Sequence, residues 1–439
     1  MSRVDWDVRG VASPAGVVRV PGDKSISHRA VMLAAIAEGR SDISGFLEGE
    51  DCLATMRAFQ AMGVSIARRG DQLVVDGVGR DGLQPPAEPL DLGNSGTSMR
   101  LLAGLLAGQA FDVTLTGDDS LRRRPMKRVI DPLRLMGAAI AGDDQGRAPL
   151  RIGGGARLAG IHYDMPVASA QVASCLLLAG LYASGETAVT EPGVCRDHTE
   201  RMLRALGAAV TRTSNVVRLC GGQSLQGGVI EVPADISSAA FALVAGAINP
   251  DADLVIEAVG INPTRTGVLQ ILRSMGATIE CRNERMCGGE PVADLHVRGG
   301  PLTGIDIDPA LVPLAIDEFP VLFVAAACAA GTTRLRGAAE LRVKESDRLA
   351  VMATGLRAMG LAVAEYEDGI DITGGPLAGA RVDSHGDHRV AMAFAIAGLR
   401  AEGVVRIDDC ANVATSFPGF EAVAGQLGLD VTVRTGDSV

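Results

Sequence analysis

The chain has 439 residues, of which 47% are hydrophobic and only 3% aromatic, so it is long enough for two or three domains with cores of small aliphatic side chains. A formal net charge of -11 argues against general binding to nucleic acid. No apolar run reaches the roughly 18 residues that span a bilayer, and the charged start MSRVDWDVRG has no signal segment. We therefore expect a cytoplasmic protein without a membrane partner.

The eight cysteines form no CxxC pair and the six histidines are scattered, so neither a disulfide framework nor a zinc site is predicted. The tetrapeptide GDKS resembles the end of a phosphate-binding P-loop, but Asp23 interrupts the required Gly-Lys-Ser order. We expect no metal and no nucleotide or other cofactor.

Taken in chain order, the predicted elements repeat six times. Each repeat has an almost wholly apolar segment predicted to form a buried helix, then a strand, an amphipathic helix and two more strands. The apolar segments are residues 30–37, 99–107, 172–183, 238–248, 321–330 and 390–399. Each amphipathic helix ends at a glycine, as in LRLMG, which predicts a C-cap; these glycines are residues 63, 137, 207, 276, 360 and 428.

Six such repeats are too many to pack around one hydrophobic core, so the pattern predicts an α/β protein with two similar domains of three repeats each. An open solenoid would also fit the period alone. The polar stretch QSLQGG at 223–228 places the division there: residues 21–230 form the N-terminal domain, and residues 1–20 with 231–439 form the C-terminal domain. We expect the N-terminal strand to complete the sixth repeat and tie the two domains together.

Charged and hydroxyl side chains precede the apolar segments. Single Ser, Asn or Asp residues there are ordinary N-caps, but cations such as Lys24 and Arg29 oppose the local helix dipole unless an anion binds. If the helix starts of two facing domains meet in one cleft, they can hold two phosphates and a carboxylate. Asp317 and Glu345 lie among these cations and are the acid–base candidates.

Nine motifs resemble the enolpyruvyltransferase family, in particular its members that act on shikimate 3-phosphate. They occur in family order over nearly the whole chain: PGDKSISHR, LGNSGTSMR, RRRPM, ASAQ, RDHTERM, IDEFP, LRVKESDRL, GDHRVAM and TSFPGF. The resemblance implies two similar domains, each of three βαβαββ units around buried helices, an inside-out α/β barrel that closes over its substrates.

The resemblance also implies the reaction. The enolpyruvyl group of phosphoenolpyruvate passes to the 5-hydroxyl of shikimate 3-phosphate through a tetrahedral intermediate, and phosphate is released. This is a shikimate-pathway step toward chorismate and the aromatic amino acids. It needs no cofactor, and we expect a monomer.

Site residues are carried over from the matching motifs. Those implied for shikimate 3-phosphate are Lys24, Ser25, Arg29, Ser169, Ala170, Gln171, Arg196, Asp317 and Lys344. Those implied for phosphoenolpyruvate are Lys24, Gly96, Arg124, Gln171, Arg348 and Arg389. Asp317 is the expected base for the 5-hydroxyl, and Glu345 is the candidate for protonating the methylene carbon, with Lys24 as its competitor.

The chain departs from the family at two positions. Many members have Lys where this chain has Thr415, and many have Ser where it has Ala170, so a contact at 170 would use the backbone. Gly96 matches the glyphosate-sensitive form of the family, and we predict inhibition that competes with phosphoenolpyruvate.

Two alternatives stay open at this point. The sister enzyme of the family, which acts on UDP-N-acetylglucosamine, usually carries Lys-Asn where Lys24 and Ser25 stand and a reactive loop cysteine, which residues 118–125 lack. A non-catalytic repeat scaffold would bind ligands without turnover; Asp317 and Glu345 among the cations argue against it.

Overall fold

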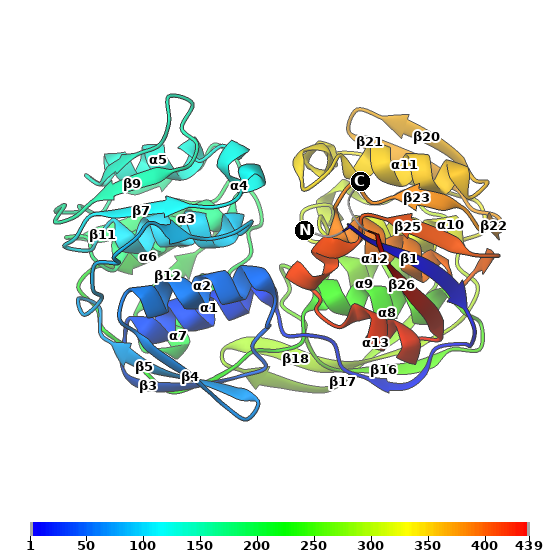
Figure 1. The fold of residues 1–439 in the computed structure, drawn as a ribbon, viewed down its shortest axis with the longest axis horizontal. Helices are drawn as coiled ribbons and strands as arrows, with labels where there is room; N and C mark the ends of the chain where they lie inside the picture. The colour runs from blue at the N-terminus through cyan, green and yellow to red at the C-terminus, as the bar shows by residue number, and fades with distance from the viewer. Residues whose placement is uncertain (1–2, 437–439) are drawn as a thin grey trace. The chain divides into compact units, whose positions relative to one another are not determined.

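The computed structural model describes residues 3–436 and has a mixed α/β fold (Figure 1). The chain divides into two compact lobes. The N-terminal lobe comprises Gly22–Val232 and Met286–Glu290; the C-terminal lobe comprises the residues up to Pro21, Pro233–Arg285 and the chain from Pro291 onward. The repeat pattern placed the division at residue 230 and assigned the short segment Met286–Glu290 to the C-terminal half.

The N-terminal lobe contains three repeats. Its central helices are α1 (Lys24–Ala35), α3 (Gly96–Leu106) and α6 (Ala170–Gly180). Its other helices are α2 (Glu50–Ala61), α4 (Asp119–Arg123), α5 (Lys127–Leu135) and α7 (His198–Ala205). Its strands are β3 (Ala37–Ser44), β4 (Ser65–Arg69), β5 (Gln72–Val78), β6 (Leu90–Asp91), β7 (Val113–Thr116), β8 (Ala139–Ala141), β9 (Leu150–Gly153), β10 (His162–Asp164), β11 (Glu186–Thr190), β12 (Val210–Thr213), β13 (Val216–Cys220), β14 (Leu225–Gln226) and β15 (Val229–Glu231).

The C-terminal lobe repeats this arrangement around α8 (Ile236–Ile248), α10 (Phe319–Ala327) and α12 (His388–Ala397). Its other helices are α9 (Gly267–Ser274), α11 (Arg348–Ala358) and α13 (Phe420–Gln426), with short 3₁₀ helices η1 (Pro309–Leu311), η2 (Ala339–Val343) and η3 (Ala411–Thr415). Its strands are β1 (Arg3–Gly10), β2 (Ala15–Val18), β16 (Asp253–Gly260), β17 (Thr278–Cys287), β18 (Glu290–Arg298), β19 (Thr332–Leu335), β20 (Ala362–Tyr366), β21 (Gly369–Thr373), β22 (Leu377–Ala378), β23 (Arg381–Asp383), β24 (Ala401–Glu402), β25 (Val405–Asp408) and β26 (Leu429–Gly436).

One strand order recurs in the sheets. In the N-terminal lobe the orders are β6-β7-β9-β8, β10-β11-β13-β12 and β14-β3-β5-β4, with β15 also pairing β3. The C-terminal lobe has β17-β18-β16-β2, β19-β21-β20 and β23-β25-β1-β26. In the last sheet β1 pairs antiparallel with both β25 and β26, so the N-terminal strand completes the sixth repeat, as the sequence predicted.

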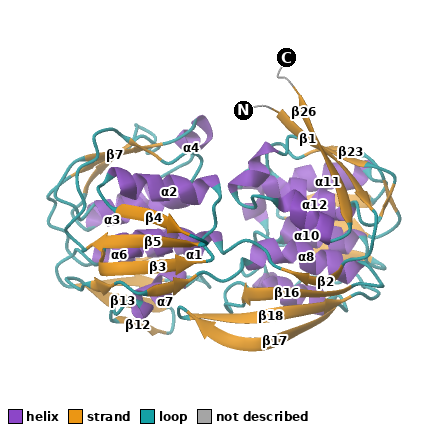
Figure 2. Ribbon diagram, turned by 60° about the horizontal axis from the view of Figure 1, so that its bottom comes forward, coloured by secondary structure: helices purple, strands orange, loops and turns teal. Residues whose placement is uncertain are grey.

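Within each lobe the helices lie inside and the strands lie around them (Figure 2). All residues of α8 are buried, because Ala, Leu, Val, Ile and Phe cover every side of this helix. The six predicted central helices are confirmed, but some of their predicted ends are wrong. Ala37 belongs to β3, and α10 ends at Ala327, because the apolar run continues from the helix into the turn and strand and hydropathy does not mark the change.

The six repeat glycines end their helices as predicted. All have φ between +86° and +101°, a conformation in which glycine has no Cβ penalty. Within residues 3–436, none of the helices combines the length and apolarity that crossing a bilayer demands.

Candidate active site

The first helix of the N-terminal lobe begins with a paired lysine. Asp23 caps α1 by accepting a hydrogen bond from the Ile26 N–H, and Nζ of Lys24 lies 2.5 Å from Oδ2 of Asp51 on α2. Lys24 therefore stands at the positive end of the α1 dipole with its charge paired with the Asp51 carboxylate. Ser25 follows it in the first turn of the helix.

Arg29, one turn further along α1, is buried, and its guanidinium makes hydrogen bonds within the lobe. Its Nε donates to Oγ1 of Thr199 at 2.6 Å, its Nη2 to Oγ of Ser174 at 2.8 Å, and its Nη1 to the backbone oxygen of Ser25 at 2.8 Å. These bonds tie α1 to α6 and α7. The sequence pointed to Arg29 as a ligand contact and did not indicate this packing role.

The start of α3 brings two guanidinium groups to Gly96. A Cβ at this glycine would stand 3.1 Å from Nη1 of both Arg100 and Arg124, so the missing side chain leaves room for both. Nη2 of Arg124 donates to Oδ1 of Asn94 at 2.5 Å. Burial, together with the charges of Arg124 and Arg128, lowers the pKa of Arg100 to about 10. A bound anion would relieve this repulsion.

Gln171 joins this group from the start of α6. Its Oε1 accepts from Nη1 of Arg100 at 2.7 Å, and its Nε2 donates to Oγ1 of Thr97 at 3.1 Å. Ser169 caps the same helix, and Ala170 is its first residue. We call Gly96, Arg100, Arg124 and Gln171 the arginine cluster. Arg196 is half-buried in the segment before α7.

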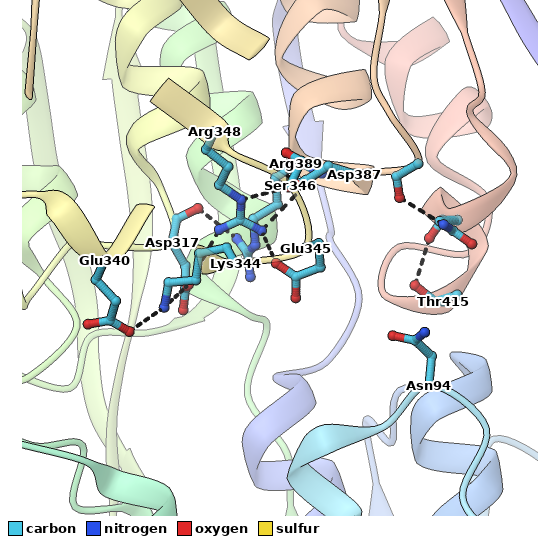
Figure 3. A network of polar contacts seen from close by, with 12 residues as sticks. Asn94, Asp317, Glu340, Lys344, Glu345, Ser346, Arg348, Asp387, Arg389 and Thr415 are labelled. Atoms are coloured by element: carbon cyan, nitrogen blue, oxygen red, sulfur yellow. Dashed lines mark hydrogen bonds and ion pairs between the residues drawn. The ribbon is translucent and has the colours of Figure 1, made fainter. Parts of the chain in front are cut away.

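The C-terminal lobe carries a second group of charges, drawn in Figure 3. Oδ1 of Asp317, the second residue before α10, lies 3.6 Å from Nζ of Lys344 and 3.6 Å from Nη1 of Arg348. Lys344 also pairs with Glu340, at 2.7 Å. Arg389 on α12 donates from Nη1 to the backbone oxygen of Asp317 at 3.2 Å. The residues that the sequence predicted from three separate motifs are therefore brought together.

Arg348 is the centre of this group. Its side chain is 1% exposed, and it donates from Nε to Oδ2 of Asp387 at 2.8 Å and from Nη2 to Oε2 of Glu345 at 2.6 Å. Its buried Nη1, which faces Asp317, donates no hydrogen bond to the described residues. We call Asp317, Lys344, Glu345, Arg348, Asp387 and Arg389 the Arg348 cluster.

Electrostatics in the Arg348 cluster keep Glu345 and Asp387 ionised. Burial raises the pKa of the Glu345 carboxyl, but the charges of Arg348 and His388 lower it more, so the pKa lies well below its usual range. The same balance of burial against Arg348 and His388 lowers the pKa of Asp387. Burial lowers the pKa of Arg348, but Glu345, Asp387 and Asp317 together raise it above its ordinary value.

Two members of these clusters were absent from the predicted site. Asp387 was seen only as part of the GDHR helix start, and Arg100 only as part of LGNSGTSMR. Asp387 was visible as the N-cap of a helix and Arg100 as a cation in the first turns of another. The partner lies 39 residues away for Asp387 and 71 for Arg100. Thr415, where many family members have Lys, donates its hydroxyl to the backbone oxygen of Asn412 at 2.6 Å. Among the described residues no group of His, Cys, Asp and Glu is arranged to hold a metal ion.

Comparison with known proteins gives one consistent result. The family model described as EPSP synthase (3-phosphoshikimate 1-carboxyvinyltransferase) matches residues 8–423. A 3-phosphoshikimate 1-carboxyvinyltransferase of Methylococcus capsulatus is 61% identical over 434 residues, which cover 98% of this chain and 99% of that protein. One of Alkalilimnicola ehrlichii is 61% identical over 431 residues, covering 98% of this chain and 97% of the relative.

Solved structures agree with these relatives. A structure of EPSP synthase from Acinetobacter baumannii is 54% identical, has a TM-score of 0.91, and is matched over 98% of this chain and 100% of its own. The enolpyruvyl transferase NikO from Streptomyces tendae is 19% identical with a TM-score of 0.79, covering 99% and 100% of the two chains, which is a likeness of fold.

Proposed function

The chain belongs to the EPSP synthase (3-phosphoshikimate 1-carboxyvinyltransferase) family, and from this premise we propose which of its residues carry the reaction. The activity is that of the family, transfer of an enolpyruvyl group from phosphoenolpyruvate to shikimate 3-phosphate in the shikimate pathway. The relatives reported above are named for the shikimate substrate and not for UDP-N-acetylglucosamine.

Phosphoenolpyruvate binds, in this proposal, to the arginine cluster and to Arg348 and Arg389. Two like charges, on Arg100 and Arg124, meet at Gly96 with the neutral Gln171 beside them. Such an arrangement is unfavourable when empty and becomes favourable when a carboxylate or phosphate binds. Lys24, at the start of α1, completes the set of cations.

Shikimate 3-phosphate binds, in this proposal, to the helix starts that carry Lys24, Ser25, Ser169, Ala170 and Gln171, with Arg196, Asp317 and Lys344. The free N–H groups of helix starts suit a phosphate. Arg29 is included from the family pattern. Its three hydrogen bonds within the lobe support a role in holding α1, α6 and α7 together as the frame of this site.

Asp317 is the proposed general base. It takes the proton from the 5-hydroxyl as this oxygen bonds to the central carbon of phosphoenolpyruvate, whose methylene carbon gains a proton to give the tetrahedral intermediate. The carbon–oxygen bond to phosphate then breaks, and loss of a proton from the new methyl group restores the double bond. The cations proposed above to bind phosphoenolpyruvate stabilise the departing phosphate.

The low pKa of Glu345 bears on which group protonates the methylene carbon. While Arg348 holds it, Glu345 is an ionised carboxylate without a proton to give. We therefore assign the donor role in the addition step to the competing candidate, Lys24, whose Nζ pairs with Asp51 at the start of α1. Glu345 suits the reverse transfer, removal of the methyl proton in elimination. An anion bound to Arg348 would weaken its hold and raise the pKa of Glu345.

The strand order shared by the sheets of both lobes supports the finer fold proposal, an inside-out α/β barrel of three βαβαββ units in each lobe. The two domain ranges predicted above, closure of the domains over the substrates, a monomeric state and a cytoplasmic location stay predictions.

The observation that carries the base assignment is the position of Asp317, whose Oδ1 lies 3.6 Å from both Lys344 and Arg348. The test measures phosphate release from phosphoenolpyruvate with shikimate 3-phosphate, and in parallel with UDP-N-acetylglucosamine. Asp317→Asn should lower kcat by about 100-fold to 10,000-fold with the shikimate compound. Asp308→Asn, which changes an exposed capping aspartate of the same lobe, is the control. Full turnover by Asp317→Asn would remove the base assignment.

A further inference from the structure

Asp317 and Glu318 are consecutive acids in the motif IDEFP, and only the first has a part in the reaction described above. Their carboxylates have different partners. Asp317 lies among Lys344, Arg348 and Arg389, whereas Glu318, the N-cap residue of α10, is 1% exposed and contacts Ser237 and Arg265. A carboxylate buried this deeply is costly unless it is paired and hydrogen-bonded, so its surroundings need an explanation.

The partners of Glu318 come from two other segments of the lobe. Oε1 of Glu318 accepts a short hydrogen bond from Oγ of Ser237, in the first turn of α8. It also lies 3.5 Å from Nη2 of Arg265, in the connection between β16 and α9. Within the described residues Oε2 accepts no hydrogen bond.

Arg265 joins these groups into one network. Its Nη2 donates to Oγ of Ser237 at 2.7 Å and lies 3.4 Å from Oδ1 of Asp235, the N-cap of α8. Arg265 and Ser237 are 3% exposed. The network therefore fixes the start of α10 to the start of α8 through side chains shielded from water, where hydrogen bonds hold geometry tightly.

We propose that Glu318, held by Ser237 and Arg265, is the positioning residue that fixes where the Asp317 carboxylate stands. This rests on the proposed function, in which Asp317 is the general base. Asp317 lies just outside α10, so the regular hydrogen bonds of that helix do not set its conformation. Two anchors hold the adjoining backbone at 317–318 instead: Arg389, which donates to the backbone oxygen of Asp317, and the buried side chain of the next residue.

The distances around Asp317 show why an anchor is needed. Oδ1 of Asp317 lies 3.6 Å from both Lys344 and Arg348, which is too long for a hydrogen bond to either cation, so these two charges attract the carboxylate without fixing its direction. A small rotation of the backbone at 317–318 would move it toward either cation and away from a substrate hydroxyl. A displacement near 1 Å costs a catalytic group about 100-fold in rate.

The test uses Ser237→Ala, which removes the hydrogen bond to Glu318 and leaves both charges in place. We expect kcat to fall between about 10-fold and 100-fold, while the KM for phosphoenolpyruvate stays unchanged because its proposed contacts lie elsewhere. Arg265→Lys keeps the charge but not the planar fork and should act in the same direction. Ser238→Ala, the same change at the next residue of α8, is the matched control and should keep the wild-type kcat.

A double-mutant cycle separates positioning from a general structural effect. Ser237→Ala is added to Asp317→Asn, with folding of every variant checked by the fluorescence of Trp6, the sole tryptophan, which is buried in this lobe. If Glu318 acts through Asp317, the second change should lower kcat no further in the Asp317→Asn background. An equal loss of kcat in both backgrounds, or none in either, would overturn the proposal. An active Asp317→Asn variant would instead remove the base assignment, which this cycle measures first.

Discussion

Nη2 of Arg348 lies 2.6 Å from Oε2 of Glu345, three residues earlier in the chain, while Nε of the same guanidinium donates to the fully buried Asp387. One cation thus holds two carboxylates ionised, and its third nitrogen, Nη1, faces Asp317 without a hydrogen bond to the described residues. In the function proposed above, this nitrogen is the donor that meets the anionic substrate.

The shape of the guanidinium at position 348 should matter as much as its charge. Arg348→Lys keeps the charge but cannot donate to Glu345 and Asp387 from separate nitrogens while a third faces the substrate. We expect the KM for phosphoenolpyruvate to rise about 10-fold to 100-fold, the worth of a hydrogen bond to a charged group. Arg357→Lys on the same helix, where the side chain is exposed, is the control. An unchanged KM would contradict the proposed contact.

Asp387 should make the stability of the C-terminal lobe depend on acid pH. Its pKa is lowered in the folded state, so its charge stabilises the fold above the unfolded value of 3.8, and the contribution is lost as the pH falls through the native pKa. Asp387→Asn should cost about 3–5 kcal/mol at neutral pH, because Arg348 loses a buried partner. The difference from wild type should stay constant down to about pH 5 and shrink below about pH 4. Urea unfolding followed by Trp6 fluorescence measures it, and a difference that grows with acid would contradict the assignment.

His28 should make the stability of the N-terminal lobe depend on pH in the mildly acid range. Burial lowers its pKa to about 3, from 6.5, and its Nδ1 lies 2.8 Å from Oγ1 of Thr55 inside the N-terminal lobe. A depressed pKa means that stability is full above 6.5 and falls as the unfolded imidazole gains a proton. Between pH 7.5 and 5 the wild type should lose about 2 kcal/mol more than His28→Gln.

Hydrogen exchange of the α1 amides, corrected for intrinsic exchange rates, measures this loss of stability in the N-terminal lobe, where His28 lies. His162→Gln, which replaces an exposed imidazole in the same lobe, should follow the wild type. A pH response of His28→Gln equal to that of the wild type would show that His28 titrates normally.

Gly96 should determine sensitivity to glyphosate. The Cβ of Gly96→Ala would meet Nη1 of Arg100 and of Arg124 at 3.1 Å, and these flexible ends can retreat by a few tenths of an ångström. We expect the inhibition constant for glyphosate to rise more than the KM for phosphoenolpyruvate, because the larger ligand loses more room. Gly228→Ala, whose Cβ meets no atom within 4 Å, is the control. Inhibition that is unchanged by Gly96→Ala, or absent in the wild type, would contradict this prediction.

How far the candidate site could be predicted depended on sequence distance. Lys24, Gly96, Arg124 and Gln171 were found because each stands in a short motif at a helix start, and such motifs are local. The Ser237–Glu318 bond joins residues 81 apart, and the Arg348–Asp387 bond joins residues 39 apart. Periodicity in a single sequence does not reveal such pairs. From the sequence alone, Glu318 and Asp387 are therefore interpreted only as ordinary helix N-cap residues.

The six repeats, their buried helices and the glycines that end the outer helices could all be predicted from the amino-acid sequence, because apolar periodicity and helix-ending glycines are properties of neighbouring residues. It also pointed to the charges at the helix starts. Which of those charges meet became visible only in the folded chain: Arg29 hydrogen-bonds Thr199 and Ser174, Arg100 joins Arg124, and Arg348 holds both Glu345 and Asp387. The physical reason is that the energy of a charge depends on burial and on partners a few ångströms away, and folding sets both through contacts between residues far apart in the chain.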